Sequence, residues 1–221
     1  MDGAALLDPV LRSLRAAAWA SATATPLGCV VGWWLARGPR RGRSAVTALA
    51  LLPLALPPVV TGYLLLALFG RQGPLGFLQV PFRFPAVVLA AAVVSLPLAV
   101  LGARAAFEAV PRRFEEVAWT LGEPPGRTLW RVTLPLAARG LSAAALLAFV
   151  RALGEIGATA VLAGNVPGQT RTLALAVYSA LQQPGGESAA AWLSAGSVVV
   201  ALLAVLGYER WQRPAWLHEG G

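Results

Sequence analysis

The chain has few of the residues on which most catalytic and metal sites depend. It contains no lysine, so all of its 18 basic residues are arginines. The absence of lysine argues against a phosphate-loop ATPase and excludes Schiff-base chemistry, because both need a lysine amine. The single cysteine, Cys29, excludes an internal disulfide, and the single histidine, His218, argues against a histidine-rich metal site. We therefore expect no catalytic residue, no metal site and no cofactor in this chain.

Charged residues are also scarce. They make up 13% of the chain, whereas hydrophobic residues make up 57%. A soluble domain is usually about one quarter charged. Four apolar runs reach the roughly 20 residues that a membrane-spanning helix needs, and they are Ala16–Ala36, Ser44–Phe69, Pro85–Ala103 and Ser188–Tyr208. A fifth run, Leu136–Gly164, is long enough if it accommodates Arg139, Arg151 and Glu155.

These runs predict an all-α protein, a polytopic membrane helix bundle with about five transmembrane helices. We expect a single domain over residues 1–221, with a membrane core of about residues 9–210. A cytoplasmic loop is expected over residues 109–135 and an outer loop over residues 164–189. Within the outer loop, Leu173–Leu181 is predicted to form a helix that lines the outer mouth, because it is too short to span the membrane.

The arginines predict how the bundle is oriented. Most of them follow the first, third and last apolar runs, and membrane proteins concentrate arginine on the cytoplasmic side. These residues are Arg37, Arg40, Arg41, Arg43, Arg104, Arg112, Arg113, Arg127, Arg131, Arg139, Arg210 and Arg213. The bias places the N-terminus outside and the C-terminus inside, as an odd number of spans requires, although Arg12 and Arg15 run against it. No basic face with interleaved aromatic residues accompanies the net charge of +8, so nucleic-acid binding is not expected.

Residues 109–135 combine an amphipathic pattern with a fixed downstream spacing. Apolar residues recur at i, i+3, i+4 and i+7, namely Phe114, Val117, Ala118 and Leu121. They predict a short helix over residues 112–121, which Gly122 ends as a C-cap. The charged residues expected to rim its exposed apolar face are Arg112, Arg113, Glu115 and Glu116. Such a face suits a groove on a partner protein. The alternative, a helix lying on lipid headgroups, leaves unexplained the Val-x-Leu-Pro sequence that begins at Val132.

Helix-breaking and polar residues inside the apolar runs are candidates for a translocation path. Pro57-Pro58-Val59-Val60-Thr61-Gly62 interrupts the backbone hydrogen bonds of the second run. In lipid this is tolerated where protein or a water-filled cavity replaces those bonds, so the segment either faces a pathway or is a kinked packing helix. Arg151 and Glu155 can pair on one helix face, either at a gate or as a structural ion pair. Further candidates are Ser95, Gly157 and Thr159.

The spacing from Glu116 to Pro135 resembles the loop by which the membrane subunit of a type I ABC importer binds its ATPase. That family's pattern is Glu-Ala-Ala, three residues, Gly, nine residues and Ile-x-Leu-Pro, and here Val117 and Val132 replace the first Ala and the Ile. Three further stretches extend the resemblance to nearly the whole chain and are most similar to molybdate-importer permeases. They are residues 52–63, residues 151–159, and residues 164–170 with 184–187. The chain departs from the family at Glu123, where a small residue is common, and at Ile156, where Phe is common.

The resemblance implies a type I ABC importer permease in the cytoplasmic (inner) membrane of a prokaryote. Its implied partners are a second copy of the chain, an ATPase dimer that binds ATP and Mg, and an external oxyanion-binding protein. The expected ATPase-coupling residues are Arg113, Glu116, Ala118, Gly122, Val132, Leu134 and Pro135. The expected path or gate residues are Pro57, Pro58, Thr61, Gly62, Ser95, Arg151, Glu155, Gly157 and Thr159. The expected outer-loop residues are Asn165, Pro167, Gly168 and Thr170.

Molybdate is the expected substrate, with tungstate next, and a sulfate or thiosulfate permease is the alternative. A secondary transporter driven by an ion gradient would carry coupling carboxylates in its spans and often repeated halves. Here Glu155 is the lone deep acid and the sequence contains no visible repeat. A non-transporting membrane scaffold would leave the spacing from Glu116 to Pro135 unexplained.

Overall fold

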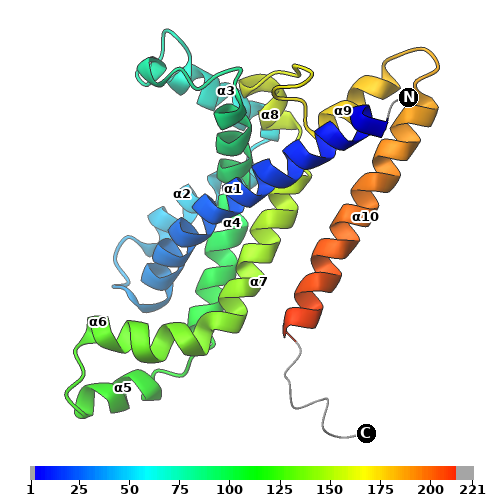
Figure 1. Ribbon diagram of the computed structural model, residues 1–221. Coiled ribbons are helices and arrows are strands. Elements are labelled where there is room, and N and C mark those ends of the chain that lie inside the picture. Colours follow the sequence, from blue (N-terminus) through cyan, green and yellow to red (C-terminus); the bar gives the residue numbers. More distant parts are fainter. Residues whose placement is uncertain (1–2, 213–221) are drawn as a thin grey trace, which may run out of the picture.

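The computed structural model of the protein describes residues 3–212, which form helices joined by turns and short loops (Figure 1). Met1, Asp2 and residues 213–221, with Arg213 and His218, lie outside this range. The longer helices are α1 (Gly3–Arg37), α2 (Arg43–Ala55), α3 (Pro58–Phe69), α4 (Phe84–Glu108), α7 (Leu134–Leu153) and α10 (Glu187–Gln212). The shorter ones are η1 (Gly76–Leu78), α5 (Arg113–Thr120), α6 (Pro125–Thr128), η2 (Leu129–Thr133), α8 (Gly157–Leu162) and α9 (Leu173–Leu181). For the residues described, the all-α prediction is confirmed.

The central helix of the bundle is α4, because α1, α7, α2 and α8 all pack against it. Its packing surfaces are rich in alanine, and Ala86, Ala90, Ala91 and Ala103 are almost completely buried. In lipid there is little hydrophobic drive between helices, so close backbone approach through small residues supplies much of the packing energy. The alanines of α4 therefore fix how α1 and α7 lie against it.

Fewer helices reach the length and hydropathy of a membrane span than the sequence predicted. Within residues 3–212 three runs do so, namely Phe84–Glu108, Pro125–Leu153 and Glu187–Arg210, and the bent pair of α2 and α3 adds a fourth if it is one span. The first predicted span, Ala16–Ala36, lies within α1, whose 35 residues are ample in length. Its tryptophan, serine, threonine and proline residues dilute the apolar ones and lower the mean hydropathy. By length and composition, three or four spans are therefore supported where five were expected.

The second predicted span, Ser44–Phe69, is not one continuous helix. It divides into α2 and α3, whose axes differ by 110°. Pro57 and Pro58 lack the N–H groups that would continue the helix, and Leu56, which precedes a proline, is extended with φ −83° and ψ 144°. The adjacent prolines thus produce a sharp bend rather than the mild kink that a single proline would give.

The fourth predicted span, Leu136–Gly164, is displaced toward the N-terminus. The helix already begins at Pro125, continues through the π-helical turn η2, and ends at Leu153, where a three-residue break separates it from α8. The π turn directly precedes Leu134 and Pro135. Because a proline cannot donate to the carbonyl four residues earlier, a widened turn accommodates its ring without ending the helix. The predicted loop over residues 109–135 is consequently mostly helical, over residues 113–120 and 125–135.

The two ends of the bundle carry different elements (Figure 1). The beginning of α1 lies beside α9, at the end of the molecule opposite to α5 and α6. Helix α9 has the bounds predicted for it, Leu173–Leu181. Helix α10 packs mainly on α9, and most of its length is left exposed in the single chain, as shown by Trp192 and Leu203 at 72% and 65% exposure.

Candidate functional site

The predicted amphipathic helix of residues 112–121 is present as α5, and Gly122 ends it as expected. Gly122 has φ +84°, in the left-handed region that glycine adopts at little energetic expense. Its N–H donates to the carbonyl of Trp119 at 3.0 Å, and the N–H of Glu123 donates to the carbonyl of Ala118 at 3.0 Å. These bonds satisfy carbonyl groups at the end of the helix, as a glycine C-cap does. The turn that follows is therefore fixed by backbone chemistry.

The outer surface of α5 is largely apolar. Its exposed apolar side chains are Phe114, Val117, Trp119 and Leu121, of which Leu121 is 79% exposed. Ala118, by contrast, is buried against the rest of the protein. Charged residues border this surface, since Glu116 is exposed and the Arg113 guanidinium lies 5.2 Å from the centre of the Phe114 ring. A short helix that presents apolar side chains with charges at their edge is suited to a groove on a partner.

The downstream part of the predicted motif lies on the continuous helix rather than in a loop. Val132 is half-buried within η2, and Leu134 and Pro135 are the first two residues of α7. Pro135 is exposed, so its effect is on the backbone. The motif therefore joins α5, through a turn, to one long helix that begins at Pro125 and whose later part, α7, packs beside α4.

An ion pair that the sequence analysis missed holds α5 on the membrane helices. Glu115 was expected to rim the exposed face, but it is buried, and its Oε1 accepts a 3.0 Å hydrogen bond from Nε of Arg37 at the end of α1. The same oxygen accepts a 2.9 Å bond from the hydroxyl of Thr133 in η2. Arg37 also donates to the carbonyl of Val110 at 2.7 Å. Three segments of the chain thus meet at the Glu115 carboxylate, and Arg37 links a fourth through Val110.

Arg37, Glu115 and Thr133 of this cluster border a cavity of about 200 Å³ that Glu116 and Trp119 also line. The ion pair is well shielded, with side-chain exposures of 11% for Arg37 and 8% for Glu115. The only sequence signal for this ion pair was the position of Arg37 at the end of the first apolar run. That position is explained equally well by the favourable interaction of a cation with a helix C-terminus. Sequence spacing could not reveal which of the two adjacent acids, Glu115 or Glu116, points inward.

Five of the expected path residues come together where α3 meets α8. A Cβ on Gly62 would lie 2.8 Å from Cα of Ala158, and one on Gly157 would lie 2.8 Å from Cβ of Pro58. Thr61 and Thr159 flank this contact and are buried, and neither hydroxyl has a hydrogen-bond partner in the described part of the chain. The five residues are Pro58, Thr61, Gly62, Gly157 and Thr159.

The other candidates in this region take different roles in the structure. Pro57 caps the start of α3. Ser95 is fully buried in α4, and its hydroxyl donates to the carbonyl of Ala92 in the same helix at 3.2 Å. This hydroxyl is therefore occupied, and among the expected path residues that the structure describes, the hydroxyls of Thr61 and Thr159 are the buried donors that remain without partners.

The predicted pairing of Arg151 with Glu155 is present, although not along one continuous helix. Glu155 lies in the break after α7, and its Oε2 accepts a 2.9 Å bond from Nη1 of Arg151. Its Oε1 accepts a 2.8 Å bond from the N–H of Ala158 in the first turn of α8. Glu155 is 2% exposed and Arg151 28% exposed. Both carboxylate oxygens therefore accept hydrogen bonds, one from the charged guanidinium of Arg151 and one from a backbone N–H at the start of α8.

The expected outer-loop residues form a folded turn tied to α1. Asn165 donates to the Ser179 hydroxyl at 2.6 Å and accepts from Nε of Arg171 at 2.9 Å. Thr170 is buried, and its hydroxyl accepts from the N–H of Val166, whereas Pro167 and Gly168 are exposed. Asn165 and Thr170 thus shape the loop, and the exposed pair forms its tip.

Helix α1 holds this loop through two bonds that the sequence did not reveal. The Ser13 hydroxyl accepts from the N–H of Leu173 at 2.7 Å, and Arg12 donates to the carbonyl of Gln169 at 3.1 Å. Arg12 also forms an ion pair with Asp8 at 2.9 Å, and this hydrogen bond lowers the pKa of the Asp8 carboxyl. Arg12, one of the two arginines that run against the orientation rule, therefore has a local acidic partner and a structural role.

The hydroxyls of Thr61 and Thr159, unpartnered in the described part of the chain, can donate hydrogen bonds to an anion. Among residues 3–212, no three His, Cys, Asp or Glu side chains are arranged to hold a metal ion. An oxyanion needs hydrogen-bond donors, and the hydroxyls of Thr61 and Thr159 are such donors. The chemistry that these two hydroxyls offer is hydrogen bonding to an anion.

Comparisons with known proteins concern the chain as a whole. The model of the family described as "binding-protein-dependent transport system inner membrane component" matches residues 24–213. The molybdenum transport system permease protein ModB of Escherichia coli (strain K12) is 42% identical over 212 residues, covering 91% of this chain and 93% of its own. ModB of Mycobacterium tuberculosis (strain ATCC 25618 / H37Rv) is 44% identical over 204 residues, covering 90% and 76%.

A third relative and a solved structure extend the comparison. The putative molybdenum transport system permease protein YvgM of Bacillus subtilis (strain 168) is 35% identical over 192 residues, covering 84% of this chain and 85% of its own. The inward-facing structure of the MetNI methionine ABC transporter superposes with a TM-score of 0.73, covering 93% of both chains. Its sequence identity is 18%, so this likeness concerns the fold alone.

Proposed function

The chain belongs to the family of binding-protein-dependent transport system inner membrane components, and we propose that it carries molybdate across the membrane for an ATP-driven importer. It is a multi-pass permease component of the inner membrane and is not the ATPase of its transporter. The observation that carries the substrate is the similarity to molybdenum transport permeases over nearly the whole chain.

The proposed arrangement has five membrane crossings. Helix α1, the bent pair of α2 and α3, α4, the run from α6 to α7, and α10 each cross once. At 35 residues α1 is about 50 Å long, which exceeds the bilayer core even when the helix is tilted. The N-terminus then lies outside and α5 lies in the cytoplasm, in keeping with the arginines that follow α1 and α4.

In the assembled transporter the exposed surface of α5 binds an ATPase subunit, and a second copy of the chain completes the pathway. The ATPase subunits bind ATP and Mg. The loop between α8 and α9 lies at the opposite end of the molecule from α5 (Figure 1), and its exposed residues Pro167 and Gly168 meet the external binding protein. This placement is supported by the apolar side chains of α5 and by the ties of Glu115 to the membrane helices.

The anion passes close to the contact of α3 with α8. Thr61 and Thr159 supply donors, while Arg151, the basic residue predicted for the path, is paired with Glu155 and does not hold the anion tightly. Weak binding suits a pathway, since an ion that binds too well does not leave. Glu155 neutralises Arg151 at this depth, so the formal charge near the path is small.

Uptake of labelled molybdate into proteoliposomes that hold this chain, its ATPase and its binding protein tests the proposal. We expect ATP-dependent uptake that excess tungstate blocks and excess sulfate does not. Equal inhibition of uptake by excess sulfate would mean that the substrate is a broader class of oxyanions rather than molybdate. Assembly and ATP hydrolysis without uptake of any of these oxyanions would refute the substrate while leaving the family assignment intact.

A further inference from the structure

The connection from α3 to α4 borders a cavity of about 820 Å³ that two arginines, Arg71 and Arg83, both line. This connection lies at the end of the molecule that carries α9, opposite α5 and α6 (Figure 1). It is the outer end in the proposed arrangement. The rest of the wall is mostly apolar and includes Phe69 and Phe82, and Gln79 adds an amide that can donate hydrogen bonds. The cavity therefore combines two cations with an apolar surround.

The positive charge of this cavity is not neutralised within the described part of the chain. The guanidinium groups of Arg71 and Arg83 have no hydrogen-bond or ion-pair partner among the described residues, and both side chains are exposed. No aspartate or glutamate occurs from Pro9 to Phe107. Glu155, which lies in the break before α8, already uses both of its oxygens. Both arginines are therefore available to an anion from outside the chain.

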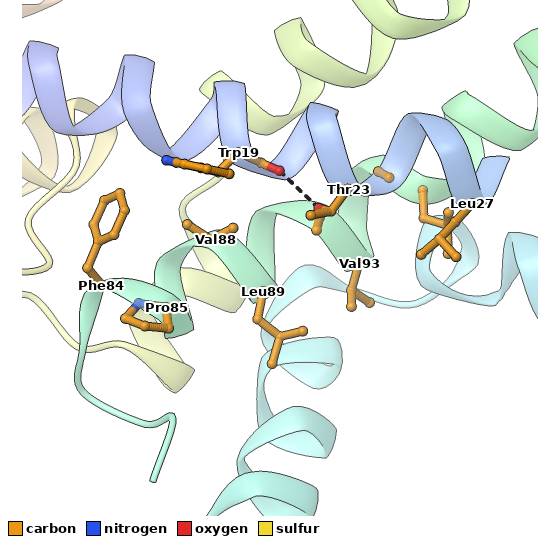
Figure 2. Close-up of a pocket in the computed structure, with 11 residues that line it drawn as sticks. Trp19, Thr23, Leu27, Phe84, Pro85, Val88, Leu89 and Val93 are labelled. Atoms are coloured by element: carbon orange, nitrogen blue, oxygen red, sulfur yellow. Dashed lines mark hydrogen bonds between the residues drawn. The ribbon is translucent and has the colours of Figure 1, made fainter. Parts of the chain in front are cut away.

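The groove between α1 and α4 is a cavity of this protein without charge (Figure 2). Its volume is about 500 Å³, and its walls come from Trp19, Thr23 and Leu27 on α1 and from apolar residues of α4. None of the described residues that line it is charged, and the Thr23 hydroxyl already donates to the Trp19 carbonyl at 3.0 Å. Of these two cavities, the one lined by Arg71 and Arg83 is the one that suits an anion.

The charged cavity adjoins the two helices that carry the unpartnered hydroxyls of the proposed path. Helix α3 carries Thr61 and ends at Phe69 in the cavity wall, about 12 Å further along at about 1.5 Å per residue. Helix α8 carries Thr159 and ends at Leu162, whose carbonyl accepts a 3.1 Å bond from the N–H of Phe82, also in the wall. An anion in this cavity therefore lies at the ends of both helices.

The wall of the cavity is held in a defined shape. Gln79 and Phe82 have φ of +48° and +60°, in the left-handed region that residues other than glycine adopt rarely. The N–H of Gln79 donates to the Gly76 carbonyl at 3.1 Å, and Phe82 is fixed to α8 as described above. Strained backbone of this kind persists where the surroundings hold it in place. The cavity is therefore formed before any ligand binds.

Two guanidinium groups suit a tetrahedral oxyanion, because each presents several N–H donors together with a permanent positive charge. The volume lies in the range of small-molecule sites, so such an ion fits with part of its water. We propose that Arg71 and Arg83 form an oxyanion-binding site outside the membrane, which holds the free ion before it reaches Thr61 and Thr159. The direction of travel rests on the proposed function, whereas binding itself needs neither ATP nor transport.

Chemical protection of the arginines tests this site on the permease assembled with its ATPase. The binding protein is left out, because it would take up the anion. The complex in phosphatidylcholine nanodiscs is treated with phenylglyoxal, which modifies exposed guanidinium groups, and peptide mass spectrometry measures the modification of each arginine. Molybdate, tungstate and sulfate are added in parallel. At about ten times the molybdate concentration that gives half protection, modification of Arg71 and Arg83 should slow about tenfold.

Two features of the result identify a single site. Arg71 and Arg83 should share one half-protection concentration, whereas Arg40 and Arg41, exposed in the turn at the other end of α1, should be modified at an unchanged rate. Arg71→Gln should raise the concentration that protects Arg83 about tenfold, since hydrogen bonds to charged groups contribute about that much to affinity. Arg71→Lys keeps the charge and should raise it less. Arg40→Gln is the matched control and should leave it unchanged.

Unchanged modification of Arg71 and Arg83 with all three anions would overturn the proposal. Equal protection of Arg40 and Arg41 would also overturn it, because that result indicates general screening by ions. Nanodiscs that contain phosphatidylglycerol test a lipid phosphate as the occupant, and protection there without molybdate, which molybdate does not increase, would exclude the free ion. Uptake of molybdate without protection would refute this site alone, whereas protection without uptake would refute the proposed transport and keep the site.

Discussion

Removal of the Glu115 carboxylate is expected to loosen α5 from the membrane helices without unfolding the bundle. In Glu115→Ala, Arg37 keeps only its bond to the Val110 carbonyl, and the buried hydroxyl of Thr133 loses its acceptor. Breaking a buried ion pair by deleting one partner costs about 3–5 kcal/mol. The adjacent cavity of about 200 Å³ can admit water to Arg37, so the lower end of that range applies here.

A loss of about 3 kcal/mol reduces the ratio of docked to undocked α5 on the order of a hundredfold. Hydrogen exchange of the α5 amides measures this ratio directly, and we expect clearly faster exchange in Glu115→Ala than in the unmodified chain. Molybdate uptake per ATP hydrolysed measures the consequence, because a detached α5 no longer moves the membrane helices. The loss of uptake should exceed the loss of ATP hydrolysis.

Two further variants test whether the effect of Glu115→Ala arises because the ion pair of Glu115 with Arg37 is buried. Glu123→Gln removes a carboxylate that pairs with Arg127 at 3.5 Å and Arg131 at 3.1 Å, but these arginines are 57% and 68% exposed. An exposed pair contributes at most about 1 kcal/mol, so this control should leave exchange and uptake nearly unchanged. Arg37→Met/Glu115→Leu replaces the buried pair by apolar groups and should restore much of the docking. Unchanged exchange of α5 in Glu115→Ala would refute the reasoning.

Three other predictions address the remaining parts of the site. Gly122→Val should weaken ATPase pull-down through backbone strain of about 1–2 kcal/mol, whereas Gly122→Asn should weaken it less. Gly62→Ala places a Cβ 2.8 Å from the Ala158 backbone and should cost about 1–3 kcal/mol in thermal unfolding, while Gly196→Ala, with nothing within 4 Å, should be tolerated. Glu155→Ala should lower the yield of assembled transporter more than Glu155→Gln, which keeps an acceptor for the N–H of Ala158.

The features that sequence predicted well are those set by neighbouring residues. The end of α5 depends on Gly122 alone, and the bounds of α9 follow from turn residues on both sides. The break of the second run depends on Pro57 and Pro58, so its place was predictable. Its 110° angle was not, because the direction of α3 is set by its packing against α8, which lies far along the chain.

The features that sequence missed depend on contacts between distant segments. Glu115 and Glu116 have the same chemistry and lie side by side on a helix of eight residues. Only one can face inward, and the choice is made by Arg37, which is 78 residues away. Likewise, the bond from Arg12 to Gln169 joins residues 157 apart and gives a structural role to an arginine that the orientation rule could not place.

The contacts of Glu155 bear on whether its pair with Arg151 is a gate or a structural element. A helix that breaks inside a membrane exposes backbone N–H groups that lipid cannot satisfy. Glu155 accepts a hydrogen bond from one such N–H at the start of α8, and its other oxygen neutralises Arg151. A carboxylate with both oxygens occupied keeps the arginine from binding a passing anion strongly, since the anion would have to displace it. We infer that the pair keeps the break folded and the path weakly charged, which leaves the hydroxyls of Thr61 and Thr159 as the groups that an oxyanion meets.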